Sequence, residues 1–404
     1  MIEKKIYKPR SQVRIANKIV VPLFFIFFSS LSAFFLEVSV RYLFPDLLQS
    51  SPCYQYHSRR YWTLRPNSTA THYFRAPNGK ITWSFPLSIS SQGLRDKEYG
   101  PKRSDEYRIL MLGDSFVYGH GVSIENTIPK QLERLLIEYY GANISVINGG
   151  VGMYCPWQYR NLLNEIGFSF NPDMIMLGLF TGNDITDTMY RHGLHQESYS
   201  EKFYHRYQLL ANRDYWNFEC EYLMRRYWQT FSAVTQFLGW PQEGSLASIL
   251  GKLPFKRIHA FPAKRPSLTR NSLLELNLVS WYPDLQEGYN IMWRDIVGIK
   301  ADSLVHDAAF MFFAIPPMEI VYDTIWNEAS VADNYERKKL NHVVNHSAHE
   351  NDIEVIPVLE RISSIDQQQT LYLEYDGHLN ESGGKFVAEI LFDYLINKYP
   401  AHLP

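Results

Sequence analysis

Five short apolar runs, each separated from the next by a segment with helical spacing, most strongly constrain how this chain can fold. The runs cover residues 108–112, 144–147, 174–180, 310–315 and 353–358. Near-continuous apolar residues are typical of strands that are covered on both faces, as in parallel sheets. Strands that alternate with helices predict an α/β protein, here a three-layer sandwich around a parallel sheet of about five strands. Ligands of such sheets bind at the carboxyl ends of the strands.

The domain organisation follows from where this alternation of strands and helices begins and where it is interrupted. It holds over residues 106–404 except at about 188–287, where clustered aromatic residues predict a helical insertion. Residues 45–105 are polar and rich in turns, with strand-like runs between them, and predict a small β-rich extension. The main helices are predicted to begin near Thr127, Pro156 and Val331 and after Gly384, and the third to end at His349.

The amino terminus has the composition of a membrane anchor. Residues 1–18 are rich in lysine and arginine, and the run from Ile19 to Leu36 carries no charge. At about 1.5 Å per residue this run spans about 27 Å of a roughly 30 Å hydrocarbon core, and apolar residues continue beyond it. We therefore expect one transmembrane helix over residues 19–44, with the basic segment in the cytoplasm and the rest on the periplasmic side of the inner membrane. The alternative is a cleaved signal peptide with its cleavage site near Ser30.

Composition and residue spacing argue against several kinds of site. The net charge of −2 gives no field that would attract nucleic acid. The three cysteines lack metal-ligand spacing and leave open either one disulfide or three thiols. Three histidines share one face of a predicted helix, but they lack the glutamate of the zinc-protease pattern and are expected to face solvent. We therefore expect no metal and no cofactor. The cysteines are Cys53, Cys155 and Cys220, and the histidines are His342, His346 and His349.

Four short blocks carry residues suited to acyl transfer, and three of them directly follow predicted strands. A serine on a Gly-Asp turn needs an adjacent base before it can attack as a nucleophile. An imidazole titrates near neutral pH and can act as that base. The blocks are Gly113-Asp114-Ser115, Asn148-Gly149-Gly150-Val151-Gly152, Thr181-Gly182-Asn183-Asp184 and Asp376-Gly377-His378-Leu379-Asn380.

Each block supplies one part of a serine-hydrolase site. Ser115 is the predicted nucleophile, and His378 is the base that takes its proton. Asp376 lies two residues before His378, on the same side of an extended segment, and would fix the tautomer of the imidazole. The backbone N–H groups of Ser115 and Gly150 and the side-chain amide of Asn183 are the predicted oxyanion donors. The structural alternatives are a helix cap at Ser115, an Asx turn at Asn183 and a tight glycine turn.

Together these blocks resemble the SGNH hydrolase superfamily, also called GDSL esterases. The landmarks of that superfamily are Ser, Gly, Asn and His in this chain order. The resemblance covers about residues 105–400 and implies those roles for Ser115, Gly150, Asn183 and His378. It also implies that the sheet is flavodoxin-like, with the blocks on its loops.

The chain also resembles the membrane-anchored branch of this superfamily that is found with cell-envelope and exopolysaccharide functions. The shared features are the basic-flanked anchor, the stretch at 91–96 ahead of the serine block and the Ile-Pro-Pro turn at 315–317. Two positions depart from the common pattern. Thr181 stands where the third block usually has glycine, and the Asp-x-x-His of most members is Asp-x-His here. The second departure makes Asp376 a less certain orienting group than His378 is a base.

The resemblance implies a serine esterase that removes O-acyl groups, most simply O-acetyl, from an envelope or secreted polysaccharide. If a sugar hydroxyl took the place of water, the same acyl-enzyme would make an O-acyltransferase. A third hypothesis is a non-catalytic scaffold or glycan-binding protein tethered to the membrane. The expected partners are an acylated carbohydrate, the membrane and the machinery of an envelope polysaccharide, and nucleic acid is not expected.

Overall fold

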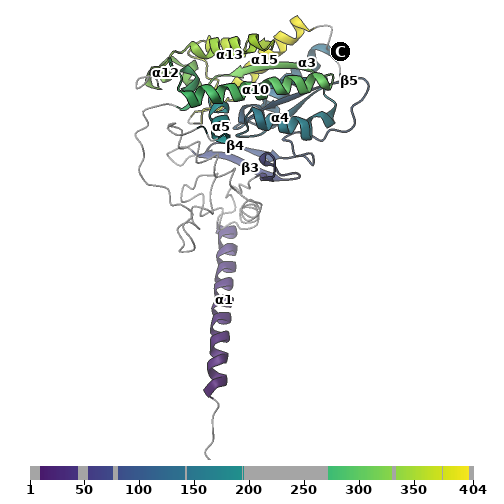
Figure 1. The fold of residues 1–404 in the computed structure, drawn as a ribbon. Coiled ribbons are helices and arrows are strands. Elements are labelled where there is room, and N and C mark those ends of the chain that lie inside the picture. Colours follow the sequence, from purple (N-terminus) through teal and green to yellow (C-terminus); the bar gives the residue numbers. More distant parts are fainter. Residues whose placement is uncertain are drawn as a thin grey trace, which may run out of the picture.

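A sheet of five parallel strands organises this protein, whose structure is a computed structural model (Figure 1). The strand order β6-β5-β7-β8-β9 corresponds to the flavodoxin-like order 2-1-3-4-5, so the predicted fold class is confirmed. The strands are β5 (Glu106–Gly113), β6 (Asn143–Gly150), β7 (Met174–Phe180), β8 (Ala309–Ile315) and β9 (Val355–Ile356). The structure describes residues 10–43, 53–75, 81–141, 143–192, 194, 272–329, 334–374 and 376–399.

The apolar runs form strands because side chains on both sides of each strand are covered. Along β5, Leu110 and Leu112 belong to one hydrophobic cluster, whereas Ile109 and Met111 belong to the cluster on the other face. All four side chains are completely buried, as expected for a strand inside a parallel sheet. The last strand is shorter than predicted because Pro357 follows it and has no N–H to extend the ladder.

Helices cover both faces of the sheet. The helices α4, α5, α10 and α13 contribute to the cluster on one face, and α3, α15 and most of α14 to the cluster on the other. Figure 1 shows α10 crossing the sheet beside α4 and α5, which it contacts. The bounds of these helices are α3 (Ile128–Tyr140), α4 (Pro156–Glu165), α5 (Asp184–Arg191), α10 (Pro283–Val305), α13 (Lys339–Glu350), α14 (Val358–Ser363) and α15 (Glu381–Lys398). The short elements are α2 (Ser115–Tyr118), α11 (Met318–Val321), α12 (Asp323–Ala329) and the 3₁₀ turns η1 (Ile124–Asn126), η2 (Gly167–Phe170) and η3 (Ser272–Asn277).

Two of the sequence predictions differ from the structure around the insertion. The helix predicted from Val331 begins only at Lys339, because Tyr335 pairs with Leu278 in an isolated bridge instead. The long helix α10 was not predicted, since three consecutive buried residues at 291–293 blur its helical period. Most of the insertion predicted at about 188–287 lies outside the described residues.

Two antiparallel hairpins precede the sheet. Strand β1 (Tyr54–His57) pairs with β2 (Tyr61–Leu64), and β3 (Thr69–Arg75) pairs with β4 (Ile81–Ser88). Trp62, Leu64 and Leu87 are buried in the same hydrophobic cluster as β5 and α4. The β-rich segment is therefore packed onto the sheet domain and shares its core.

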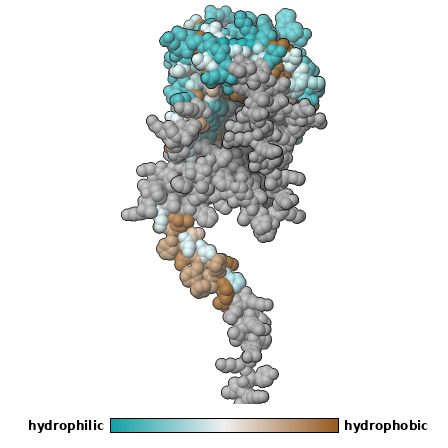
Figure 2. Space-filling model, turned by 90° about the vertical axis from the view of Figure 1, so that its left-hand side faces the viewer, coloured by the Kyte–Doolittle hydropathy of each residue, from teal (hydrophilic) through white to brown (hydrophobic). Residues whose placement is uncertain are grey.

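The N-terminal helix α1 (Arg10–Leu43) is long, and the side chains from Val20 to Ser39 are mostly apolar and exposed. Within it, Val20–Ser39 is long and apolar enough to cross a membrane, and its 20 residues correspond to about 30 Å of helix. None of this stretch is buried by the rest of the described chain, and Figure 2 shows its hydrophobic surface in contrast to the hydrophilic head. A core helix would be covered on at least one face, so the exposed apolar surface favours a membrane anchor.

Candidate active site

Ser115 is the first residue of the short helix α2 and follows β5 directly. The Asp114 side chain caps this helix, because its Oδ1 accepts a hydrogen bond from the Phe116 N–H at 2.9 Å. Strand β5 lies between β6 and β7, where the strand order reverses. The carboxyl ends at such a switch point are where ligands bind in this fold. The predicted nucleophile therefore lies at the expected place for a site.

The three residues predicted as nucleophile, base and orienting carboxylate lie together. The Nε2 atom of His378 is 2.7 Å from the Oγ atom of Ser115, although the two residues are 263 positions apart in the chain. The other ring nitrogen, Nδ1, is hydrogen-bonded to Oδ1 of Asp376. Because Nδ1–H donates to the carboxylate, Nε2 is left to accept the hydroxyl proton of Ser115.

The electrostatics of Asp376 suit an orienting role. Burial by itself would raise the pKa of this carboxyl, but interactions with His120 and His378 outweigh burial and hold the pKa well below its usual range. Asp376 is therefore ionised throughout the pH range in which imidazoles ordinarily titrate. An ionised carboxylate next to one ring nitrogen favours the protonated form of an imidazole.

Two other carboxyls beneath the site have the opposite shift. Burial raises the pKa of Asp114 to about 6, against the hydrogen bond from the Phe116 N–H and the attraction of His378. Burial and repulsion from Asp114 raise the pKa of Asp184 well above its usual range. Asp184 accepts hydrogen bonds from the Tyr159 hydroxyl at 2.8 Å and from the Phe180 N–H at 3.1 Å. Both carboxyls thus hold loops at the carboxyl ends of β5 and β7.

The predicted oxyanion donors Gly150 and Asn183 differ in whether their N–H groups are already used in hydrogen bonds. The N–H of Gly150 donates to Oδ1 of Asn148 at 3.0 Å, so its single proton is engaged in this structure. A Cβ on Gly150 would lie 2.1 Å from the Tyr118 backbone nitrogen, so glycine is needed there for α2 to approach β6. Asn183 donates one Nδ2 proton to Asp187 at 2.8 Å, and its second amide proton remains.

His120 is a contact of the site that the sequence did not single out. It follows Gly119, which has a left-handed φ of 82° at the end of α2. Its Nε2 atom lies 3.7 Å from Oδ2 of Asp376, and its ring centroid lies 4.5 Å from that of His378. The sequence feature that could have identified His120 is its position between two glycines, shortly after Ser115.

Arg95 is a second residue whose role was not predicted. Its guanidinium is buried and donates to the carbonyls of Tyr118 at 2.8 Å, Gly119 at 2.6 Å and Val122 at 2.7 Å. Only 1% of the side chain is exposed, so these bonds satisfy a buried cation. The stretch at 91–96 therefore braces the loop that follows the serine.

One cluster in the described part of the chain has the composition of a metal site. His120, Asp376 and His378 place ligand-type atoms within 4.8 Å of one another. However, Asp376 already accepts from Nδ1 of His378, and Nε2 of His378 already contacts Ser115. The atoms that a metal would need are thus used in a chain of contacts that ends at the serine hydroxyl.

The other histidines and cysteines considered in the sequence lie apart from this site. The three histidines of α13 are exposed, as predicted. Cys53 and Cys155 are buried, and burial raises the pKa of the Cys155 thiol. Cys220 lies outside the described residues. The exposed histidines are His342, His346 and His349.

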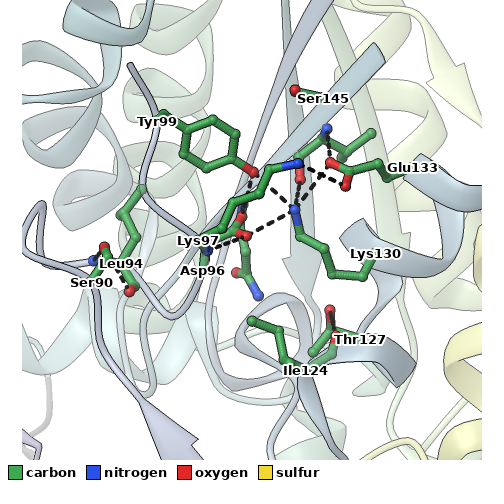
Figure 3. A network of polar contacts seen from close by, with 12 residues as sticks. Ser90, Leu94, Asp96, Lys97, Tyr99, Ile124, Thr127, Lys130, Glu133 and Ser145 are labelled. Atoms are coloured by element: carbon green, nitrogen blue, oxygen red, sulfur yellow. Dashed lines mark hydrogen bonds and ion pairs between the residues drawn. The ribbon is translucent and has the colours of Figure 1, made fainter. Parts of the chain in front are cut away.

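A separate polar cluster, the Lys130 cluster, lies beside β6 and α3 (Figure 3). The Lys130 ammonium contacts Asp96 at 2.9 Å, Glu133 at 3.1 Å, the Tyr99 hydroxyl at 2.9 Å and the Val146 carbonyl at 2.7 Å. Cavities of about 440 and 550 Å³ border it. Every group that contacts Lys130 in this cluster has an opposite charge or a hydrogen-bond partner.

Several solved structures of hydrolases are similar to this chain. A lipase/acylhydrolase from Enterococcus faecalis is 11% identical, with a TM-score of 0.37 over 72% of this chain and 96% of that chain. A catalytic mutant of Axe2, an acetylxylan esterase from Geobacillus stearothermophilus, is 9% identical, with a TM-score of 0.37 over 72% and 93%. A member of the lipolytic protein G-D-S-L family from Veillonella parvula is 11% identical, with a TM-score of 0.35 over 73% and 99%. No family model matches the sequence, and no curated protein matches it.

Proposed function

We propose that this chain is a serine esterase of the SGNH, or GDSL, type that forms an acyl-enzyme on Ser115. The observation that carries the proposal is the 2.7 Å contact between Ser115 Oγ and His378 Nε2, with Asp376 on the other ring nitrogen. A serine hydroxyl becomes nucleophilic when such a base takes its proton. The four sequence blocks that resemble this superfamily supply the same residues.

In the proposed mechanism, Ser115 Oγ bonds to the ester carbonyl carbon while its proton moves to His378 Nε2. The carbonyl oxygen then carries the negative charge, which the Ser115 N–H and the second amide proton of Asn183 stabilise. Gly150 joins them when its N–H leaves Asn148. The intermediate collapses, the C–O bond to the alcohol breaks, and His378 returns the proton to the leaving oxygen. Water attacks the acyl-enzyme in the same way, releases the carboxylic acid and restores Ser115.

The proposed substrate is an O-acylated, most simply O-acetylated, polysaccharide of the envelope or of a secreted glycan. The resemblance to the membrane-anchored, exopolysaccharide-associated branch supports this class of substrate. The basic segment at 1–18 favours a cytoplasmic amino terminus, so α1 would present the sheet domain to glycans on the periplasmic side. A reporter enzyme that is active only outside the cytoplasm, fused after Pro404, should therefore be active, and an inactive fusion would contradict this orientation.

The activity is tested with the full chain in detergent and an O-acetylated polysaccharide. Acetate in solution is quantified for the wild type and for Ser115→Ala at equal concentrations of folded protein. We expect acetate to appear only with the wild type. If the acetyl group appears instead on an added bare glycan, the protein is an acyltransferase. Equal acetate release by the two proteins would contradict the proposal. So would a wild type that neither releases acetate nor transfers it to the bare glycan.

A further inference from the structure

The carboxylate that orients His378 is shared by two histidines. Oδ1 of Asp376 accepts from Nδ1 of His378, and Oδ2 faces Nε2 of His120 at 3.7 Å. This second distance is longer than a hydrogen bond, so the contact is electrostatic. Catalytic contacts of this kind often shorten when substrate is bound. Both oxygens of the buried carboxylate therefore face an imidazole.

His120 is held toward Asp376 from several sides. Its backbone N–H donates to the Ser115 carbonyl at 2.9 Å, which ties it to the nucleophile's own loop. Arg95 holds the carbonyls of the two residues just before it. The edge of the Trp83 ring meets the His120 ring at 5.2 Å, and the His72 ring lies 5.9 Å away. The last two residues belong to the hairpin β3–β4, which thereby reaches the active site.

We infer that His120 is a positioning residue for the proposed esterase, acting through Asp376. A carboxylate fixed through one oxygen can still rotate about its Cβ–Cγ bond. A second contact at Oδ2 restricts that rotation and keeps Oδ1 directed at Nδ1 of His378. The inference rests on the proposed function, and it adds that a residue outside the triad, braced by the β-rich extension, sets the geometry of the base.

Two substitutions distinguish the contact of the His120 ring nitrogen with Asp376 from the packing of its ring. His120→Phe keeps a ring against Trp83 but has no nitrogen to face Asp376. His120→Gln keeps an amide nitrogen at the same number of bonds from Cβ as Nε2. The control is His306→Phe, which makes the same exchange at a ring that stacks on Phe168 just before β8, at the amino ends of the strands.

The assay is steady-state hydrolysis of p-nitrophenyl acetate by the full chain. Loss of a residue that orients a catalytic group typically lowers activity about 10- to 100-fold. We expect His120→Phe to lower kcat by that factor with KM unchanged, because His120 is inferred to act through Asp376. His120→Gln should recover most of the loss, and His306→Phe should stay within about threefold of the wild type.

A double-mutant cycle with Asp376→Asn shows whether His120 acts through the carboxylate. We expect His120→Phe to have less than about a twofold effect in the Asp376→Asn background. A loss as large as in the wild-type background, or a wild-type rate for His120→Phe alone, would overturn the inference while leaving the esterase intact. A wild type without Ser115-dependent hydrolysis would overturn both.

Discussion

The active-site residues and the Lys130 cluster lie in the same domain, yet their polar groups are used in opposite ways. Around Lys130, one cation meets two carboxylates, a hydroxyl and a carbonyl, and the charges are balanced. Around Ser115, the contacts form a chain that runs from Asp376 through His378 to the serine hydroxyl, the order required by the proposed mechanism. A balanced cluster stabilises a fold, whereas an ordered chain that ends on a nucleophile supports a reaction.

This difference shows that cavities and charge alone do not locate the site. The two cavities of about 440 and 550 Å³ border the Lys130 cluster and not Ser115. The position of Ser115 at the switch point of the sheet and the 2.7 Å contact to His378 are the more informative features. We therefore expect substitutions at the two places to affect different quantities, catalytic rate at one and unfolding free energy at the other.

The largest expected effect is that of His378→Ala on catalysis. Without its base, Ser115 keeps its proton at the moment of attack. In triads of this kind the loss of the base lowers kcat by roughly 10⁴- to 10⁶-fold. The loss of kcat is measured as the rate of p-nitrophenyl acetate hydrolysis, and thermal unfolding shows whether the variant is folded. Retention of a tenth or more of the wild-type kcat would show that His378 is not the base.

Asp376→Asn should have the next largest effect. The amide can hold His378 in the wrong tautomer and cannot stabilise the imidazolium, which typically costs about 10⁴-fold in kcat. The same assay measures the loss, and KM should change little because Asp376 is proposed to act through His378. An effect below about tenfold would show that Asp376, at this Asp-x-His spacing, is not the carboxylate that orients His378.

Lys130→Met tests the other side of the comparison. Removing the cation leaves the almost completely buried carboxylate of Asp96 without its ammonium partner, whereas Glu133 keeps its contact with Lys97 at 3.2 Å. Breaking such a buried pair costs about 3–5 kcal/mol of unfolding free energy. Denaturant unfolding should show this loss, while kcat per folded molecule stays within about twofold. A large loss of kcat with unchanged stability would mean that the Lys130 cluster takes part in the reaction.

The smallest effect expected is a change in the pH dependence of stability in Asp114→Asn. The folded-state pKa of Asp114, about 6, lies above the 3.8 of an ordinary aspartate. The folded protein therefore binds more protons than the unfolded one between about pH 4 and pH 6, so this group lowers stability as the pH rises through that window. Asparagine keeps the helix cap and removes the titration. Unfolding free energies at pH 4, 5, 6 and 7 should fall less steeply in the variant, and equal slopes would contradict the shift.

The sequence was most informative where local pattern determines structure. The five apolar runs predicted the strands, because a strand covered on both faces leaves a direct mark on composition. The end of β9 and the start of α13 were misjudged, because Pro357 and the bridge of Tyr335 to Leu278 override the apolar pattern. Helix α10 was missed since its buried positions are not confined to one narrow stripe.

For the site, the sequence predicted which residues have suitable chemistry but not all of their contacts. Ser115, His378 and Asp376 come together as their blocks suggested. Arg95 and His120 were missed because their contacts with carbonyls and with Asp376 join segments far apart in the chain. The engagement of the Gly150 N–H by Asn148 depends on a side-chain direction that no spacing specifies.

The most direct test of the central claim is covalent modification by a fluorophosphonate, which reacts with activated serines. The full-length protein is labelled, digested and examined by mass spectrometry to locate the modified residue. We predict that the wild type carries the phosphonyl group on Ser115 and that Ser115→Ala and His378→Ala remain unlabelled. Modification of another residue, equal labelling of Ser115→Ala, or an unreactive wild-type protein that is folded would contradict the claim that Ser115 is a nucleophile activated by His378.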